Sequence, residues 1–444
     1  MPLLLVAVLA AGSLTACGSG SDPNTVKVAY NRSTDNKIRF KDAFLGSVKK
    51  QFETAHPGKK IELLPIQASD EDYATKLQQM MRSPRTAPDL VYEDTFRLKS
   101  DIEAGYLRPL DDYLKSWDGW DQFIDASKAA VTAEDGKPYA VPSGTDTRGL
   151  WFNKAIFAKA GLPEDWQPRT WADVLDAART IKRKVPGVIP LNIYTGKGAG
   201  ERSVMQDFEM LLYGTGEDPL YNPDTKKWVS GSKGFKDALG FVQTVYGEKL
   251  GPDVTDALDP NVNTRVTTEW LPEGKLAMDL DGSWLGQNWA KGGPREWPEW
   301  SKELGQAAMP TQNGQAPGKV SMSGGWTWAM PARSKNSDLA WDFLKALETP
   351  DNVVTWAIAD SQIASRKDVA ADPRYLNSRP GVKFFTDLVQ NTHYRPALPV
   401  YPQVSTAISE AMESVTTGDV SAAKAAKEYD GQLRTIIENA GGAQ

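Results

Sequence analysis

The sequence of 444 residues contains one cysteine, Cys17, and only two histidines. A single thiol excludes an internal disulfide framework, and beyond Cys17 the chain has neither a cysteine nucleophile nor a thiolate metal ligand. His56, in "HPG", and His393, in "NTHYRP", have no companion at the spacing of a metal site or a catalytic triad. We therefore expect no metal, no cofactor and no catalytic residue, and a fold stabilised by its hydrophobic core.

Long hydrophobic runs are also missing from the body of the chain. Beyond Cys17, no segment approaches the 18 consecutive apolar residues expected of a membrane-spanning helix. The formal net charge is −6, and acidic and basic residues are mixed along the sequence. Nucleic acids and anionic membranes attract clustered positive charge, so neither is an expected partner of this chain, and we expect a soluble body.

The apolar segment "PLLLVAVLAAGSLTA" has the length of a signal-peptide core, although no Lys or Arg precedes it. Leu14-Thr15-Ala16-Cys17 resembles the bacterial lipobox, which implies cleavage before Cys17 and acylation of its thiol. We predict a signal peptide at 1–16, with the lipobox at 14–17, and a lipidated flexible linker at 17–25. The protein would then be held at the outer face of the cytoplasmic membrane by its N-terminal lipid only. A chance cysteine in a cleaved signal is the alternative.

The first part of the mature chain alternates strand-like and helix-like patterns. Val26, Val28 and Tyr30 alternate with polar residues, and an amphipathic helix follows, with Phe44, Val48 and other apolar residues on one face. "KIELLPI" and "PDLVY" predict two further strands. This order predicts a parallel sheet, in which ligands bind beyond the carboxyl ends of the strands. The loops "YNRSTD", "PIQASDEDY" and "YEDTFR" are therefore expected to line one wall of a site.

The mature chain has about 425 residues, which is more than one hydrophobic core normally supports. We therefore expect two lobes. "KPYAVPSGTDTRGLWFNKAIF" has the pattern of a crossing between them. Beyond it, Thr170 and Asp173 form a capping box at the start of a helix. "VIPLNIYT", "GQAAMP" and "GGWTWAMPARS" predict strands, and Tyr401 to Ile437 predicts helix.

Motifs for other chemistries are incomplete. "YTGKGAGERS" lacks the spacing of a phosphate loop, and in a calcium loop counted from Asp279 the twelfth residue would be Ala290 instead of glutamate. A carboxylate pair for glycoside hydrolysis stays open, because 57 acidic residues offer many pairs. The distinctive feature is 15 tryptophans, several of them beside polar, glycine-containing segments. Flat rings suit the C–H faces of a sugar, and polar groups suit its hydroxyls.

Together, "VKVAYNRS", the crossing segment, "TWADVL", "MDLDGSW", "GGWTWAMPARS" and "SRKDV" resemble the extracellular sugar-binding lipoproteins of ATP-driven importers, the maltose-type family of solute-binding proteins. The resemblance implies an α/β, two-lobe periplasmic-binding-protein-like fold of type II. Each lobe would be a β-sheet flanked by helices, joined by a hinge of crossing segments. We expect lobe I at 26–142 and 305–350, and lobe II at 143–304 and 351–444.

The resemblance also assigns ligand-binding residues. Trp284 would stack on a sugar ring, and Asp146 would accept hydrogen bonds from hydroxyl groups. Trp326 would lie in a loop at the cleft. Further expected contacts are Glu93, Asp94 and Arg97 after the third strand, Asn31 and Arg32 after the first, and Glu201, Arg366 and Tyr401. Pro402 and Ser405 stand where the maltose binder has a tyrosine and an arginine, which argues against simple maltose specificity.

We accordingly expect a monomer that captures a di- or oligosaccharide by hinge closure and delivers it to the transmembrane permease subunits of an ABC importer. Two alternatives stay open. One is a secreted glycoside hydrolase with two carboxylates about 5–10 Å apart across the bound ring. The other is a binding protein for a polyol or a glycerol phosphate. A phosphate group would need cations near the cleft, and only Arg32 and Arg97 are positioned for that.

Overall fold

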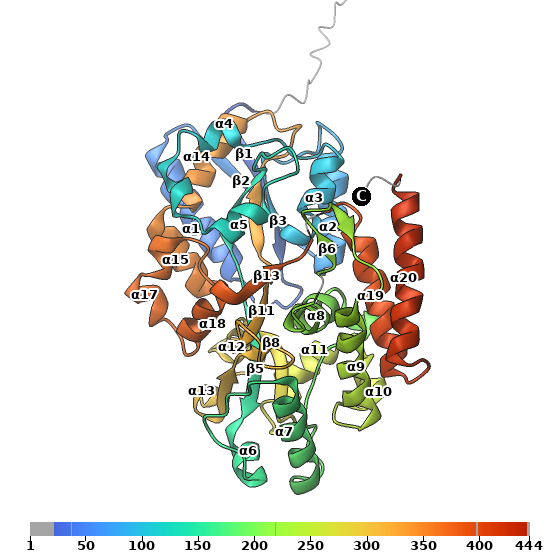
Figure 1. The fold of residues 1–444 in the computed structure, drawn as a ribbon. Helices are drawn as coiled ribbons and strands as arrows, with labels where there is room; N and C mark the ends of the chain where they lie inside the picture. The colour runs from blue at the N-terminus through green and yellow to red at the C-terminus, as the bar shows by residue number, and fades with distance from the viewer. Residues whose placement is uncertain (1–21, 37, 218, 397, 442–444) are drawn as a thin grey trace, which may run out of the picture.

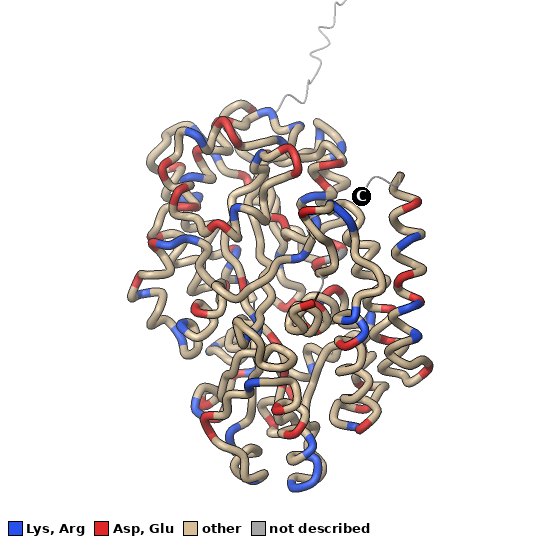
Figure 2. The backbone as a smooth tube through the Cα atoms, viewed as in Figure 1, with Lys and Arg blue, Asp and Glu red and all other residues tan. Residues whose placement is uncertain are grey.

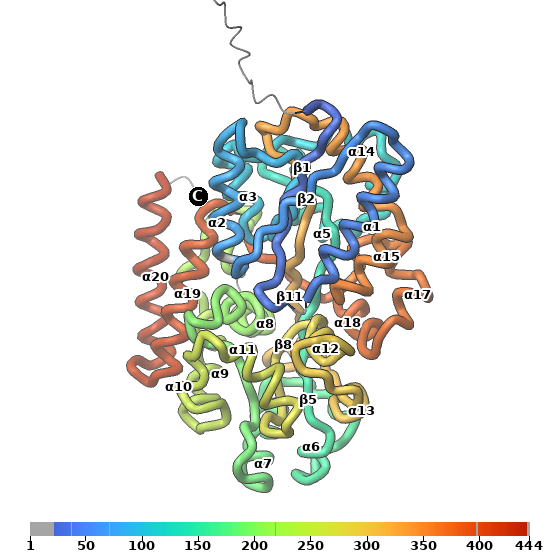
Figure 3. The backbone as a smooth tube through the Cα atoms, turned by 180° about the vertical axis from the view of Figure 1, so that it is seen from behind, coloured from blue at the N-terminus to red at the C-terminus, as the bar shows by residue number. Residues whose placement is uncertain are grey.

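The structure is a computed structural model that describes residues 22–36, 38–217, 219–396 and 398–441. The predicted signal peptide, the lipobox and Cys17 lie outside the described residues. Figure 1 and the reverse view in Figure 3 show two α/β lobes, one above the other, with the N-terminal strands in the upper lobe. Lys, Arg, Asp and Glu are interspersed over both lobes (Figure 2).

The first lobe is built on a five-stranded sheet in the order β2-β1-β3-β12-β4. β1 is parallel to β2 and to β3, as the sequence predicts, whereas β12 is antiparallel to β3 and to β4. The strands are β1 (Thr25–Arg32), β2 (Lys60–Gln67), β3 (Leu90–Asp94), β4 (Ala140–Gly144) and β12 (Trp326–Ala329). Because β12 comes from late in the chain, the first lobe is discontinuous in sequence.

Helices cover both faces of this sheet. Val26 and Val28 pack with Phe44 of α1 on one face, while Ala29 packs with Tyr73 of α2 on the other. This follows from the period of two along a strand. The helices of this lobe are α1 (Phe40–Ala55), α2 (Asp70–Met81), α3 (Thr95–Glu103), α4 (Asp111–Leu114), α5 (Asp125–Ala130), α14 (Ser337–Leu347) and α15 (Pro350–Ala359).

The second lobe contains the antiparallel sheet β8-β5-β9 and a smaller sheet, β10-β11-β13. The strands are β5 (Arg148–Asn153), β8 (Met278–Gly282), β9 (Leu304–Ala307), β10 (Met309–Pro310), β11 (Lys319–Ser323) and β13 (Thr392–Tyr394). The largest core cluster joins β5, β8 and β9 to the main helices. These are α6 (Lys154–Ala160), α7 (Trp171–Lys184), α8 (Glu209–Gly214), α9 (Lys233–Gly247), α19 (Tyr401–Thr416) and α20 (Ala422–Asn439).

Short elements complete the fold. A hairpin of β6 (Tyr221–Asn222) and β7 (Lys227–Trp228) precedes α9. Two segments, η3 (Ser203–Phe208) and η4 (Val266–Trp270), are π-helical. The remaining short helices are α10 (Val254–Ala257), α11 (Val262–Arg265), α12 (Leu285–Trp289), α13 (Trp300–Glu303), α16 (Lys367–Ala370), α17 (Pro373–Leu376) and α18 (Val382–Leu388). Within the described ranges, no helix combines the length and apolarity needed to cross a membrane.

Two local predictions have opposite outcomes. The capping box at the start of α7 is confirmed, because Thr170 accepts a hydrogen bond from the backbone of Asp173 and the Asp173 carboxylate accepts one from Thr170. The strand predicted in "VIPLNIYT" is wrong, because this segment makes only isolated bridges at Ile189 and Asn192. Pro190 lies between them and has no N–H to donate to a strand partner.

The chain crosses between the lobes from β4 to β5 and again from β11 to β12. Gly325, in the second crossing, has a φ of +135°, and a Cβ there would lie 2.5 Å from the carbonyl oxygen of Gly144. Glycine therefore lets the two crossing segments lie side by side. β9 pairs with β5, and Trp356 of α15 packs on Phe44 of α1 at 4.9 Å between ring centroids. We propose that the first lobe comprises 26–144 and 326–359, in place of the expected return at 305.

Candidate ligand-binding cleft

A cavity of about 320 Å³ lies between the two lobes. Its first-lobe wall comes from α2, α3 and the ends of β3 and β12. Its second-lobe wall comes from residues 198–206, from the segment after β8 and from residues near the crossings. The structure brings these predicted site residues together around it: Glu93, Asp94, Arg97, Asp146, Glu201, Trp284 and Trp326.

A second chamber of about 520 Å³ lies beside this cavity and contains Asn31 and Arg32 in its lining. The two spaces share Asp70, Asn263 and Trp326. The two chambers therefore adjoin at these three side chains.

Asn31 and Arg32 lie at the carboxyl end of β1, where the parallel sheet predicts ligand contacts. The Asn31 amide donates to Asp70 Oδ1 at 3.1 Å and accepts from Lys41 Nζ at 2.6 Å. Arg32 Nε donates to Asp42 Oδ1 at 2.9 Å. These contacts fix polar groups at the mouth of the second chamber.

Glu93 is buried at the end of β3, with 2% of its surface exposed. Burial raises its pKa well above the ordinary value, and the neighbouring Asp101 carboxyl raises it further. Burial also raises the pKa of Asp101. This pair therefore retains a proton where free carboxyls have lost theirs, so it can both donate and accept hydrogen bonds. Arg97, in the first turn of α3, places its guanidinium 4.9 Å from the Phe96 ring centroid.

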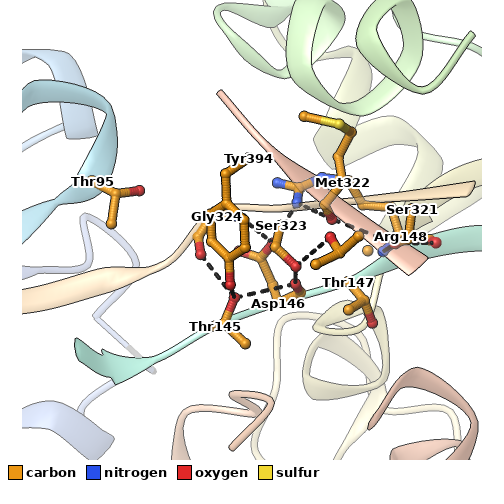
Figure 4. A network of polar contacts seen from close by, with 12 residues as sticks. Thr95, Thr145, Asp146, Thr147, Arg148, Ser321, Met322, Ser323, Gly324 and Tyr394 are labelled. Atoms are coloured by element: carbon orange, nitrogen blue, oxygen red, sulfur yellow. Dashed lines mark hydrogen bonds and ion pairs between the residues drawn. The ribbon is translucent and has the colours of Figure 1, made fainter. Parts of the chain in front are cut away.

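Asp146 lies in the first crossing, within the contact network of Figure 4. Its carboxylate accepts hydrogen bonds from the Arg148 guanidinium and, at 3.0 Å, from the Gly324 backbone N–H. Its carbonyl oxygen accepts from Ser323 Oγ at 2.6 Å, and Arg148 also donates to the Met322 carbonyl oxygen at 2.9 Å. Asp146 thus joins the two crossing segments and lines the cavity at the same point.

The two predicted aromatic contacts come from different lobes. Trp326 begins β12 and stacks on Tyr92, with ring centroids 4.9 Å apart and an interplanar angle of 8°. Trp284 follows β8 and lies beside two guanidinium groups, those of Arg148 at 5.1 Å and Arg202 at 5.5 Å from its ring centroid. Both tryptophans are half-buried and line the cavity.

Arg395 connects the two lobes across the cleft. Its guanidinium donates to Asp94 Oδ1 at 2.8 Å and to Thr95 Oγ1 at 2.9 Å in the first lobe, and to Glu201 Oε2 at 3.2 Å in the second. Burial raises the pKa of Glu201, and the charge of Arg395 opposes that rise. The Tyr401 hydroxyl donates to Glu201 Oε1 at 2.8 Å. Tyr401 is therefore buried behind Glu201 and supports it without lining the main cavity.

Arg366 lies outside the residues that line the two chambers. Its guanidinium pairs with Asp368 at 2.7 Å, donates to the Glu348 carbonyl oxygen at 2.7 Å and lies 5.5 Å from the Phe123 ring centroid. With 3% of its surface exposed, it connects α16 to the end of α14.

Sequence reasoning did not select five charged residues of the cavity lining, namely Asp70, Asp101, Arg148, Arg202 and Arg395. Asp70 lies in the predicted loop "PIQASDEDY", and Arg148 lies in the quoted crossing, so both were within reach of the sequence pattern. Arg202 lies in "YTGKGAGERS" and Arg395 in "NTHYRP", but the patterns tested there, a phosphate loop and a histidine site, do not point to either arginine. Among the described residues, no group of three or more His, Cys, Asp or Glu side chains is placed to hold a metal ion.

Two α/β lobes around a polar, aromatic-lined cleft, connected by paired crossing segments, define a solute-binding protein of type II. The comparisons agree. The model of the bacterial extracellular solute-binding protein family matches residues 37–354, and the chain belongs to this family.

Individual relatives have low sequence identity to this chain, but the matches cover most of both chains. A galactooligosaccharide-binding protein of Bacillus subtilis is 24% identical over 428 residues, covering 91% of this chain and 90% of its own. The diacetylchitobiose binding protein DasA of Streptomyces coelicolor is 27% identical over 358 residues, or 77% of each chain. The solved cyclic alpha-maltosyl-1,6-maltose binding protein of Arthrobacter globiformis has a TM-score of 0.76 at 23% identity and covers 94% of this chain and 100% of its own. The predicted fold class and family are thereby confirmed.

Proposed function

We propose that this protein is the extracellular substrate-binding component of an ABC carbohydrate importer and captures a di- or oligosaccharide in the cleft. The observation that carries the proposal is the placement of Trp284 and Trp326, from opposite lobes, on one cavity that also contains carboxyl and guanidinium groups.

The chemistry of the lining favours a neutral, hydroxyl-rich ligand. Most charged groups of the main cavity are already paired: Asp146 with Arg148, Arg202 with Asp281, and Arg395 with two carboxylates. Such pairs offer hydrogen bonds to hydroxyl groups without a net charge to be neutralised. A phosphate would instead need clustered unpaired cations, so the polyol and sugar alternatives fit better than glycerol phosphate.

The names of the relatives support the same substrate class, because the proteins of B. subtilis, S. coelicolor and A. globiformis are named for binding galactooligosaccharides, diacetylchitobiose and a cyclic maltosyl-maltose. They do not agree on one sugar. We therefore propose the class, a di- or oligosaccharide, and leave its identity to experiment.

Closure of the lobes about the crossing segments would convert binding into a signal for the permease. A ligand that contacts both walls favours the closed arrangement by its differential affinity for it. We further propose that Cys17, which lies outside the described residues, carries the lipid that anchors a monomeric protein at the outer face of the cytoplasmic membrane.

Isothermal titration calorimetry of the chain from Ser19 to Gln444 with maltose, lactose, galactobiose, diacetylchitobiose and their trisaccharide homologues tests the proposal. We expect one sugar to bind at about micromolar affinity or tighter and to be recovered intact by chromatography. Release of cleavage products would establish the hydrolase alternative. Absence of heat with every sugar, together with binding of glycerol or glycerol 3-phosphate, would overturn the sugar assignment.

A further inference from the structure

The main cavity is closed at one end by Arg395 and Phe96. Behind them lies a small separate cavity of about 20 Å³, lined partly by Lys99, Leu398 and Tyr401. Arg395 and Phe96 are the two residues that line both this space and the main cavity. Their side chains therefore form the partition between the two.

This partition is fixed from both lobes. The Arg395 side chain is 8% exposed and bonds to Asp94, Thr95 and Glu201. Its guanidinium lies 5.2 Å from the Phe96 ring centroid, and Phe96 in turn packs edge-on against Tyr401 at 5.9 Å. Moving the partition would break two partly buried ion pairs of a buried guanidinium, which is costly.

The opposite end of the cleft differs. There the main cavity adjoins the second chamber at Asp70, Asn263 and Trp326, and that chamber of about 520 Å³ is far larger than the 20 Å³ behind Arg395. The lining of that chamber includes exposed residues, among them Thr34, Ser69 and Thr264. The cleft is thus closed at Arg395 and reaches solvent at the second chamber.

We propose that the cleft binds a linear oligosaccharide by one chain end, with Arg395 as the specificity-determining residue that excludes any extension at that end. The proposal rests on the sugar-binding function proposed above. The terminal ring lies in the closed main cavity, where Arg395 and its carboxylate partners face the terminal hydroxyls. Further units continue past Trp326 into the second chamber.

Small caps at each end of the ligand test this asymmetry. Every disaccharide of the calorimetry panel that binds is compared with its methyl glycoside, capped at the reducing end, and with its 4′-O-methyl ether, capped at the other end. We expect one cap to weaken binding by about 30-fold or more and the other to change it by less than about three-fold. Equal tolerance of both caps, or equal rejection, would overturn the proposal.

Two variants of Arg395 show whether the capped sugar is excluded by the volume of this side chain or by its charge. Arg395→Met keeps most of the side-chain volume and is expected to retain the rejection of the cap. Arg395→Ala removes that volume and is expected to reduce the penalty to within about five-fold. Arg179→Ala, which removes an arginine paired with Glu248 and Asp176 away from the cleft, is the matched control and should retain the wild-type penalty.

The outcomes also distinguish this proposal from the proposed function. If no sugar binds the wild-type protein, the proposed function is wrong, and no capped sugar will bind either. If sugars bind but Arg395→Ala retains the full penalty in a protein with a wild-type melting temperature, Arg395 is not the end wall. If Arg395→Ala does not fold, Phe96→Ala removes the other half of the partition, and an unchanged penalty there contradicts the proposal.

Discussion

The two walls of the cleft are built differently. The first-lobe wall consists of segments that follow three parallel strands, including residues of α2 and α3, together with the first residue of β12. The second-lobe wall combines the end of an antiparallel strand, β8, with residues before and within the π-helical segment η3. A parallel sheet sets where its loops meet, whereas the second wall depends on contacts between segments distant in sequence.

The two tryptophans differ in the same sense. Trp326 rests on the ring of Tyr92 within the first-lobe core, so its position depends on packing. Trp284 also packs against a core cluster, but it lies beside two guanidinium groups, those of Arg148 and Arg202, whereas the Trp326 ring has one cation beside it, Lys41 at 5.1 Å. The position of Trp284 therefore depends more on cation–π contacts and on the ion pairs that hold those arginines. The first should affect both stability and binding, and the second chiefly binding.

The largest effect is expected from Trp284→Ala. Removing this ring should lower affinity for the bound sugar by about 100-fold, because stacked aromatic anchors dominate such sites. The free energy of unfolding should change by less than about 1 kcal/mol. Calorimetry and urea denaturation measure the two quantities. Trp120→Leu, at a half-buried tryptophan absent from the lining of both chambers, should keep wild-type affinity, and an equal loss there would refute the assignment.

Trp326→Ala should affect both quantities. We expect affinity to fall by about 30-fold and the free energy of unfolding to fall by about 2 kcal/mol, because the stacked pair with Tyr92 is lost. The same two measurements apply. If stability were unchanged, the contrast between a packed and a cation-supported tryptophan would be wrong.

Arg366→Leu should give the converse result. Loss of the pair with Asp368 and of the bond to the Glu348 carbonyl should lower the free energy of unfolding by about 2 kcal/mol. Sugar affinity should stay within about two-fold of wild type, since Arg366 lines neither chamber. A large loss of affinity with unchanged stability would instead show that Arg366 contributes to ligand binding.

A smaller effect, on pH dependence, is expected in both lobes. Burial raises the pKa of Glu209 in the second lobe and of Glu348 in the first from 4.5 to about 8. Each carboxyl keeps its proton in the folded state while the unfolded chain loses it above pH 4.5. Stability therefore falls as the pH rises through this window and not further above pH 8.

Glu209→Gln and Glu348→Gln should each reduce this fall, by about 1 kcal/mol at the upper end of the window. Thermal denaturation at several pH values between 4.5 and about 8 measures this loss of stability. The Tyr401 hydroxyl lies within hydrogen-bond distance of both Glu209 and Glu201, so only Glu209→Gln should also shift the pH dependence of sugar binding. If the two variants showed the same pH dependence of sugar binding, Glu209 would have no influence on the cleft.

Much of the fold could be predicted because it follows local rules. Strand alternation in β1, the apolar face of α1 and the capping box of α7 are set by neighbouring residues. The antiparallel insertion of β12 between β3 and β4 could not be read from these patterns. It depends on a pairing between segments far apart in the chain.

The site follows the same division. Residues at strand ends, such as Asn31, and residues in family motifs, such as Trp284, were within reach of the sequence. Arg395 was not, because its contacts with Asp94 and Glu201 join residues separated by 301 and 194 positions. Its role is apparent only when three distant segments are placed together.

The central claim is that one sugar is held by both walls at once, and the distance between the lobes tests it most directly. Lys115→Cys in the first lobe and Arg183→Cys in the second, both at exposed positions, allow single-molecule energy-transfer measurements in a Cys17→Ser background. We predict that a saturating concentration of the sugar that binds wild type shifts the population to a single, closed distance, and that Trp284→Ala loses this shift. Sugar binding with full calorimetric heat and an unchanged distance distribution would contradict the account.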